Sequence, residues 1–198
     1  MPSHRDTRGR RQWAVLPVVA VLATGASQLS VTAEVGVQSL EDTRALAELG
    51  VADAQYNLAI RYGRGEDVPQ DWPESARWLQ LAADQGHAPA QSALGLLYRE
   101  ALGVMPDDTV AVEWFRRGAE QGDANGQFLL ASMYANGQGI LQDNVEAFMW
   151  LQLATDQSRG ELRERYVASR DEVAAQMTEE ETTEAQRRAR AWTPTPER

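Results

Sequence analysis

The fold of this chain is decided by residues 88–123, which read APAQSALGLLYREALGVMPDDTVAVEWFRRGAEQGD. Residues 88–98 place small and apolar side chains at helical spacing, and a turn containing glycine follows them. Asp107 then opens a second helical segment, which carries Trp114 and ends before Gly122. The stretch therefore predicts two helices joined by a tight turn.

This pattern occurs three times in the chain, at a spacing of 36 residues. Six positions of the pattern hold the same residue type in all three copies: Ala52, Ala88 and Ala124; Gln55, Gln91 and Gln127; Leu58, Leu94 and Leu130; Tyr62, Tyr98 and Tyr134; Asp71, Asp107 and Asp143; Trp78, Trp114 and Trp150. Agreement at this many positions indicates an internal repeat. We therefore expect a stack of helix pairs in which each pair packs on its neighbours.

The residue types within each copy are suited to closely packed helices. Leu58 and Tyr62 lie four residues apart and so share one buried helix face. Small residues keep the first helix of each copy thin enough for a neighbour to approach closely: Ala59, Gly95 and Ala131. Two aspartates are expected to cap second helices, each in a capping box with a glutamate three residues later: Asp71 with Glu74, and Asp143 with Glu146.

The string A-x-A-Q-x-x-L-G-x-x-Y, then G-x-G-V, an aspartate and A-x-x-W-x-x-x-A-x-x-Q-G-x-A, resembles the Sel1-like repeat, a relative of the tetratricopeptide repeat. Three copies cover residues 51–158. The resemblance implies an all-α fold, a right-handed α/α solenoid of antiparallel helix pairs. Asp67 and Ala101 stand where the family pattern has turn glycines, so we expect the turns of copies one and two to be less regular.

The segments on either side of the repeats are expected to close the stack. Residues 34–50 resemble half a repeat and are interpreted as an N-terminal capping helix. Residues 159–192 predict a C-terminal capping pair of helices, the second of which begins at a capping box formed by Thr178 and Glu181. Two prolines end that helix, and residues 193–198 are expected to be a flexible tail.

The N-terminal 33 residues have the layout of an export signal. Four arginines precede an apolar run from Trp13 to Ala23, and small residues follow at the positions that a signal peptidase reads. This layout predicts cleavage after Ala33 and a periplasmic or secreted protein, with no membrane span in the mature chain. An uncleaved N-terminal membrane anchor is the alternative.

The composition excludes most catalytic chemistry. The chain has no cysteine and no lysine, and it has only two histidines, His4 and His87. These absences exclude thiolate, disulfide, Schiff-base and P-loop chemistry. His87 is expected to be a solvated turn residue. We therefore predict no catalytic residue, no cofactor and no metal site. The net charge of −10 argues against binding to nucleic acid.

The resemblance to tetratricopeptide solenoids implies that the first helix of each copy lines a concave face. Residues at matching offsets from the core leucines then outline an amphipathic groove for a peptide or a partner helix: Tyr56, Ile60, Arg64, Ser92, Leu96, Arg99, Asn125, Phe128, Ser132 and Asn136. The alternative for Ile60 and Leu96 is that both side chains pack against the adjacent repeat.

Three functions agree with these observations. The first is an exported scaffold, adaptor or regulator that binds a protein or peptide partner and is not an enzyme. The second is a periplasmic hydrolase, because some cysteine-rich relatives of the repeat family are linked to β-lactam binding or hydrolysis. The absence of cysteine from this chain weakens the argument that it shares the activity of those relatives. The third is self-association through an exposed end of the stack.

Overall fold

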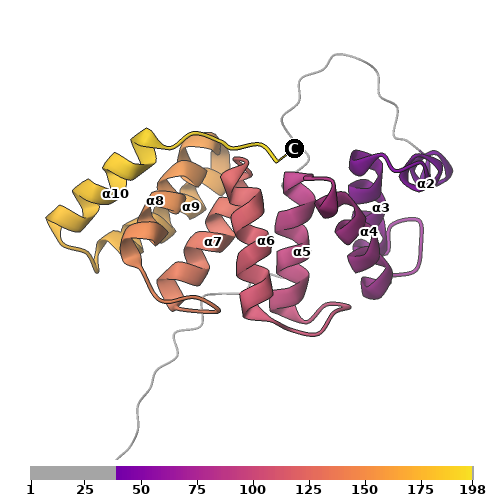
Figure 1. The fold of residues 1–198 in the computed structure, drawn as a ribbon, viewed down its shortest axis with the longest axis horizontal. Coiled ribbons are helices and arrows are strands. Elements are labelled where there is room, and N and C mark those ends of the chain that lie inside the picture. Colours follow the sequence, from indigo (N-terminus) through magenta and orange to yellow (C-terminus); the bar gives the residue numbers. More distant parts are fainter. Residues whose placement is uncertain (1–38, 198) are drawn as a thin grey trace, which may run out of the picture.

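The computed structural model describes residues 39–197, and all secondary structure in this range is α-helical (Figure 1). The expected export signal, residues 1–33, lies outside the described residues, as does the first part of the expected cap at 34–50. The helices are α2 (Leu40–Glu48), α3 (Ala52–Arg64), α4 (Trp72–Asp84), α5 (Ala88–Glu100), α6 (Asp108–Glu120), α7 (Ala124–Asn136), α8 (Asn144–Gln157), α9 (Gly160–Ala174) and α10 (Glu179–Ala191).

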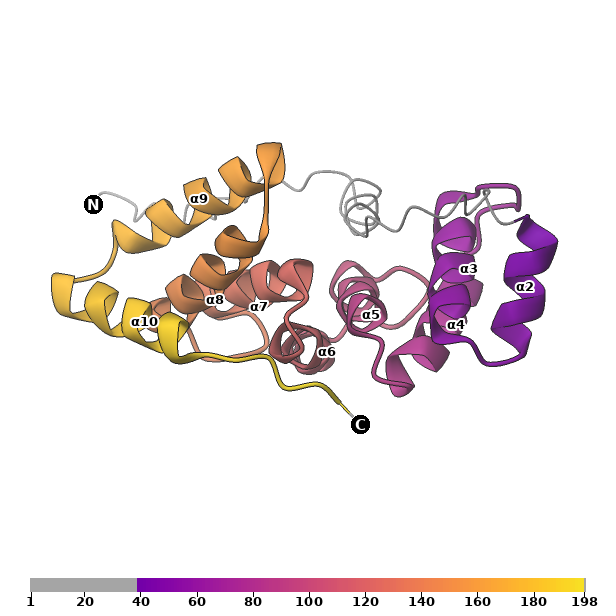
Figure 2. The same ribbon diagram turned by 90° about the horizontal axis from the view of Figure 1, so that it is seen from above.

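The helices pack as consecutive pairs, which confirms the predicted all-α repeat fold. The three repeats form the pairs α3/α4, α5/α6 and α7/α8, and the second helix of each of the first two pairs contacts the first helix of the next. At the ends of the row, α2 packs on α3, while α9 and α10 both pack on α8. Figure 2 shows the helices in a row that runs from α2 at one end to α9 and α10 at the other.

The core runs along the whole stack, and the predicted apolar positions form it. Leu58, Leu94 and Leu130 are fully buried, one in each repeat. Gly95 shows why small residues follow these leucines in the sequence, because a Cβ atom at Gly95 would lie 2.7 Å from Cδ1 of Phe115. A larger residue at position 95 would therefore push α5 away from α6.

A buried glutamine in each repeat joins it to the preceding helix. The side-chain amides of Gln55, Gln91 and Gln127 donate to the main-chain carbonyl of the last residue but one of that helix, at Ala47, Ala83 and Ala119, over 3.1, 3.1 and 3.3 Å. Their oxygens accept from a second set of glutamines near the helix ends: Gln85, Gln121 and Gln157. Because α2 accepts such a bond at Ala47, it takes the place of a second helix before repeat one.

The helix caps follow the sequence prediction in part. Asp71 and Asp143 accept bonds from main-chain N–H groups of the first turns of α4 and α8, as expected. The predicted capping boxes at these positions are wrong. The carboxylate of Glu74 binds Arg77 and that of Glu146 binds Arg188, because an arginine side chain lies within reach of each. The predicted capping box of Thr178 and Glu181 is present at the start of α10.

The turns that join the two helices of each repeat are alike, so the expected irregularity of copies one and two is wrong. The first turn position is left-handed in all three copies, with φ of 70°, 57° and 64° at Gly65, Ala101 and Gly137. The second turn position is left-handed as well, at Asp67, Gly103 and Gly139. Packing of the helices fixes the turn geometry, and the two non-glycine residues adopt it at some conformational cost.

Contacts with the neighbouring repeat explain where a non-glycine residue is tolerated. A Cβ atom on Gly103 would overlap the backbone of Trp72, and one on Gly139 would overlap the backbone of Asp108. Position 67 has more room, since the side chain of Asp67 is 68% exposed and forms an ion pair with Arg61. Glycine is therefore required at positions 103 and 139 for space as well as for φ.

The C-terminal segment differs from the expected flexible tail. Residues 193–197 run back along the stack, and the amide of Thr195 donates to the carbonyl of Glu120 over 2.7 Å. Glu197 reaches Arg117 with its carboxylate. Tertiary contacts of this kind are not visible in a short proline-containing sequence.

Replacing Gly103 with alanine is expected to destabilise the fold. The added Cβ atom meets the Trp72 backbone and imposes left-handed strain, so the free energy of unfolding should fall by about 2 kcal/mol or more. Ala101→Gly is the matched control, and it should raise that free energy by roughly 0.5–1 kcal/mol because it relieves strain where space is not limiting. Urea unfolding followed by circular dichroism measures both. Equal midpoints for Gly103→Ala and the wild type would contradict the close approach.

Candidate binding site

The predicted groove residues fall into two groups by burial. Tyr56, Arg64, Arg99, Asn125, Phe128 and Ser132 are half-buried, and Asn136 is exposed. Ile60, Ser92 and Leu96 are only 8%, 3% and 1% exposed. The burial of Ile60 and Leu96 fits the alternative that they pack against the adjacent repeat. We therefore leave these two out of the surface that a partner would touch.

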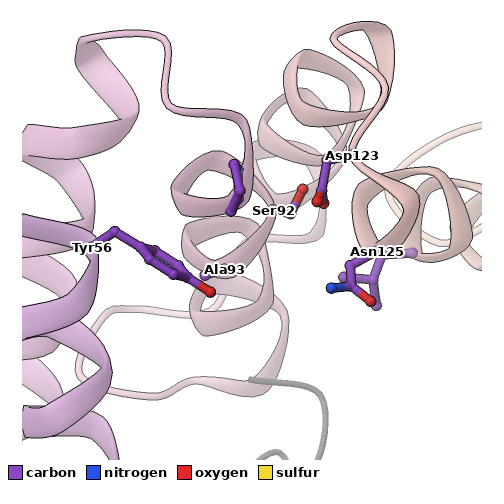
Figure 3. Close-up of a pocket in the computed structure, with 7 residues that line it drawn as sticks. Tyr56, Ser92, Ala93, Asp123 and Asn125 are labelled. Carbon is purple, nitrogen blue, oxygen red and sulfur yellow. The ribbon is translucent and has the colours of Figure 1, made fainter. Parts of the chain in front are cut away.

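A small cleft lies where α3, α5 and α7 meet, and Figure 3 shows its labelled side chains. It has room for only about 20 Å³, and its lining combines apolar and polar groups: Tyr56, Pro89, Ser92, Ala93, Asp123, Asn125 and Leu129. Three of these, Tyr56, Ser92 and Asn125, belong to the predicted groove. We call this hollow the polar cleft.

The polar cleft exists because copy two breaks the pattern of its neighbours. Tyr56 and Phe128 occupy matching positions in copies one and three, and the same position in copy two is Ser92. The space around Ser92 is narrow, since a Cβ atom on Gly118 or Gly126 would overlap its hydroxyl oxygen. The serine permits this close approach, and the polar cleft lies beside it, lined by Tyr56 of one helix and Asn125 of another.

Two polar groups in the cleft are incompletely satisfied. Among the described residues the buried hydroxyl of Ser92 has no hydrogen-bond partner. Asp123 lies beside it in Figure 3, and its Oδ2 atom accepts a bond from the amide of Gly126 over 2.7 Å, which caps α7. Burial raises the pKa of Asp123 above its usual range, although the neighbouring Ser92 hydroxyl and the Gly126 amide oppose the shift. Because the Ser92 hydroxyl has almost no exposed surface, the cleft offers a donor the carboxylate of Asp123, with the serine oxygen beside it.

His87 is not the solvated turn residue that was expected. Its Nδ1 atom accepts a bond from the amide of Ala90 over 3.1 Å and so caps α5. Its Nε2 atom lies 3.0 Å from Oδ1 of Asp53, and its ring packs on Tyr56 with centroids 5.0 Å apart. These contacts hold the His87 ring at the start of α5, and only 16% of its side chain is exposed. Because both nitrogens have partners, His87 is not placed to act as a base toward Ser92.

Helix α9 adds residues that the sequence did not assign to the site. Tyr166 is buried, donates its hydroxyl to Oδ1 of Asn125 over 2.9 Å, and stacks on Phe128 at a centroid distance of 4.6 Å. The guanidinium of Arg165 lies 4.9 Å from the centre of the Phe128 ring. The sequence assigned residues 159–192 to the C-terminal cap, and Tyr166 belongs to the first helix of that cap. The folding of α9 against α8 brings it to Asn125 and Phe128.

A second hollow lies among α7, α8 and α9. It has room for only about 10 Å³, and apolar side chains with two serines line it: Phe128, Ala131, Ser132, Ala135, Leu151, Ser169 and Val173. We call it the apolar cleft. Helix α7 lines both hollows, since Asn125 and Leu129 face the polar cleft and Phe128 faces the apolar one.

The described part of the chain offers little other chemistry. From residue 39 to residue 197, no three histidine or acidic side chains cluster so as to hold a metal ion. No helix in that same range combines the length and apolar character required to cross a membrane.

Comparison with known proteins places the chain in a family. The Sel1 repeat matches residues 52–87, 88–123 and 124–158. A crystal structure of a Sel1 repeat protein from Oxalobacter formigenes is 33% identical, with a TM-score of 0.57, over 65% of this chain and 97% of that one.

The crystal structure of c5321, a protective antigen of uropathogenic Escherichia coli strains that displays an SLR fold, has a TM-score of 0.58. It is 24% identical and covers 77% of this chain and 40% of that one, so it supports the fold alone. No curated protein gives a significant match. Because the repeat matches more than half of the chain, the protein belongs to the Sel1 repeat family.

Proposed function

We propose that this protein is a scaffold that binds a segment of a partner protein on its inner face. This is the face formed by the first helices of the three repeats, α3, α5 and α7, which we call the inner helices. The two clefts lined by α7 carry this proposal, because they provide two hollows of opposite character beside one helix. Sel1 repeat proteins are generally protein-interaction scaffolds, and three such repeats make up most of the described stack.

The size of the clefts favours a peptide ligand. Sites for small molecules usually enclose about 300–1,000 Å³ and surround most of the ligand. The polar and apolar clefts are far smaller, with room for about 20 and 10 Å³, which is close to the space of one water molecule. Such shallow hollows would take only the tips of side chains from a longer segment, which would gain most of its contacts along the inner helices.

The chemistry of the clefts indicates which side chains they accept. Ser92, Asp123 and the half-buried Asn125 favour a hydrogen-bond donor such as arginine, lysine or an amide. The apolar cleft favours an aliphatic side chain. We therefore expect the bound segment to combine a donor-bearing residue with an aliphatic one. Neither the geometry of His87 and Ser92 nor the comparisons support the hydrolase alternative.

We further infer that the scaffold works outside the cytoplasm of a bacterium. The support is the sequence of residues 1–33, with its basic head, short apolar run and small residues before Glu34. A partner in the bacterial envelope would then meet the inner face after export.

Charging Phe128 is expected to abolish binding of the partner segment. Phe128→Glu places a carboxylate in the wall of the apolar cleft, so peptides enriched by phage display on the wild-type protein should lose at least tenfold in affinity, or about 1.4 kcal/mol. Leu141→Glu makes the same change at a residue that is 88% exposed in a loop and should leave affinity unchanged. Fluorescence polarisation measures affinity, and circular dichroism checks helicity. Equal affinity for both variants would place the binding surface elsewhere.

Removing the Ser92 hydroxyl is expected to move stability and binding in opposite directions. Because this buried hydroxyl has no partner, Ser92→Ala should leave the free energy of unfolding unchanged or raise it by ~0.5–1 kcal/mol. The same change should weaken peptide binding roughly fivefold through loss of an acceptor.

Ser75→Ala is the matched control for this prediction. The hydroxyl of Ser75 donates to the carbonyl of Ala59 over 2.8 Å in the core, so its loss should lower stability and leave affinity unchanged. A Ser92→Ala variant that loses stability and keeps its affinity would assign Ser92 a structural role only.

Export is tested on the full chain expressed in a Gram-negative host. We expect the protein in the periplasmic fraction, beginning at Glu34, as read by N-terminal sequencing. Intact protein that still begins at Met1 and sediments with membranes would instead support the uncleaved anchor.

A further inference from the structure

The last residues of the chain follow the ends of the helices in an extended path. Figure 1 shows the chain leaving α10 and running back across the stack toward α5. The ring of Trp192 meets that of Trp150 edge-on, with centroids 6.0 Å apart. Beyond it, the amide of Thr195 donates to the carbonyl of Glu120 at the end of α6. The segment therefore lies on the turns that connect successive repeats.

The turn glycines leave space for this segment. A Cβ atom on Gly122 would lie 3.7 Å from Cγ of Pro194, and one on Gly86 would lie 3.2 Å from Cβ of Glu197. Gly86 and Gly122 are equivalent positions of consecutive repeats. We call the row formed by these two turns, with Gln91 and Arg117, the turn edge.

The spacing of the tail matches the spacing of the repeats. Pro194 and Glu197 are three residues apart, and an extended chain covers about 10 Å in three residues. Packed helices lie about 8–10 Å apart, so an extended segment passes equivalent turns at intervals of roughly three residues. The next equivalent glycine, Gly50, has no atom within 4 Å of an added Cβ, so its turn has room as well.

Glu197 occupies a site built for a carboxylate. Arg117 donates from Nε and Nη2 to the two carboxylate oxygens over 2.8 and 2.7 Å, and the Gln91 amide adds a bond of 2.9 Å. The guanidinium of Arg117 lies 4.4 Å from the centre of the Trp114 ring, which holds it in place. The bonds from Arg117 lower the pKa of Glu197, which keeps the carboxylate charged.

Only repeat two has this carboxylate site. The position of Arg117 is Leu81 in repeat one and Leu153 in repeat three, while the glutamine at position 91 is present in all three. The arginine is therefore a feature of one turn and not of the repeat, which gives an extended segment a single register on the turn edge.

We infer that the turn edge is a second binding surface, which takes an extended segment with a carboxylate three residues after a proline. The tail of this chain, residues 193–197, occupies it in cis. A partner segment with the same chemistry binds there only when the tail leaves. This surface is formed by the turns, and it is independent of the clefts beside Phe128.

Amide exchange at Thr195 tests the cis contact in the full chain. We expect the bond to Glu120 to slow exchange at least about tenfold relative to an unstructured peptide. Arg117→Gln and Glu197→Gln should each remove most of this protection. Arg116→Gln is the matched control, because Arg116 donates to the hydroxyl of Tyr134 and does not touch the tail. Exchange of Thr195 at the unstructured rate in the wild type would overturn the docked tail.

A labelled peptide with the sequence of residues 193–198, TPTPER, tests the surface itself. A chain that ends at Trp192, with helicity verified by circular dichroism, should bind the peptide at least tenfold more tightly than the full chain does. Arg117→Gln in the shortened chain should abolish binding, and Arg116→Gln should not. Equal binding by the full and shortened chains, or no binding by the shortened chain, would overturn the inference.

Discussion

The buried glutamine of each repeat is the contact on which the regular stacking depends. The amides of Gln55, Gln91 and Gln127 lie in the core, where a polar group without partners is costly. Each one donates to a carbonyl at the end of the preceding helix and accepts from a glutamine at the end of the second helix of its own repeat. These bonds can form only if successive pairs meet in one register. The same contact therefore fixes the spacing of the turns and of the inner helices.

The sequence predicted the regular part of this structure because the same residue types recur every 36 positions. Helix starts, turn positions and core leucines follow from spacing and local chemistry alone. The partners of long side chains did not follow, since Glu74 and Glu146 bind arginines and do not close capping boxes. The docked tail was also missed, because its partners lie 75 or more residues away in the chain.

The candidate site was predictable only in outline. Offsets from the core leucines selected Tyr56, Ser92 and Phe128, of which the first two line the polar cleft and the third lines the apolar one. The same offsets included Leu96, which is buried. Tyr166 could not be found this way, because it belongs to a helix outside the repeat pattern. One signal was readable: the series Tyr56, Ser92 and Phe128 contains a small residue between two rings, and the cleft forms there.

The features that distinguish this chain are departures from its own repeat, and copy two holds most of them. Ser92 forms the polar cleft and Arg117 holds the tail, while the glutamine contacts are the same in every copy. Because each pair packs mainly on its neighbours, a gene duplication of copy two could be inserted without disturbing the joints at either side. Such a descendant would carry two serines in succession between the aromatic walls and a hollow one repeat longer. The length of the binding surface could therefore change in evolution while the fold stays the same.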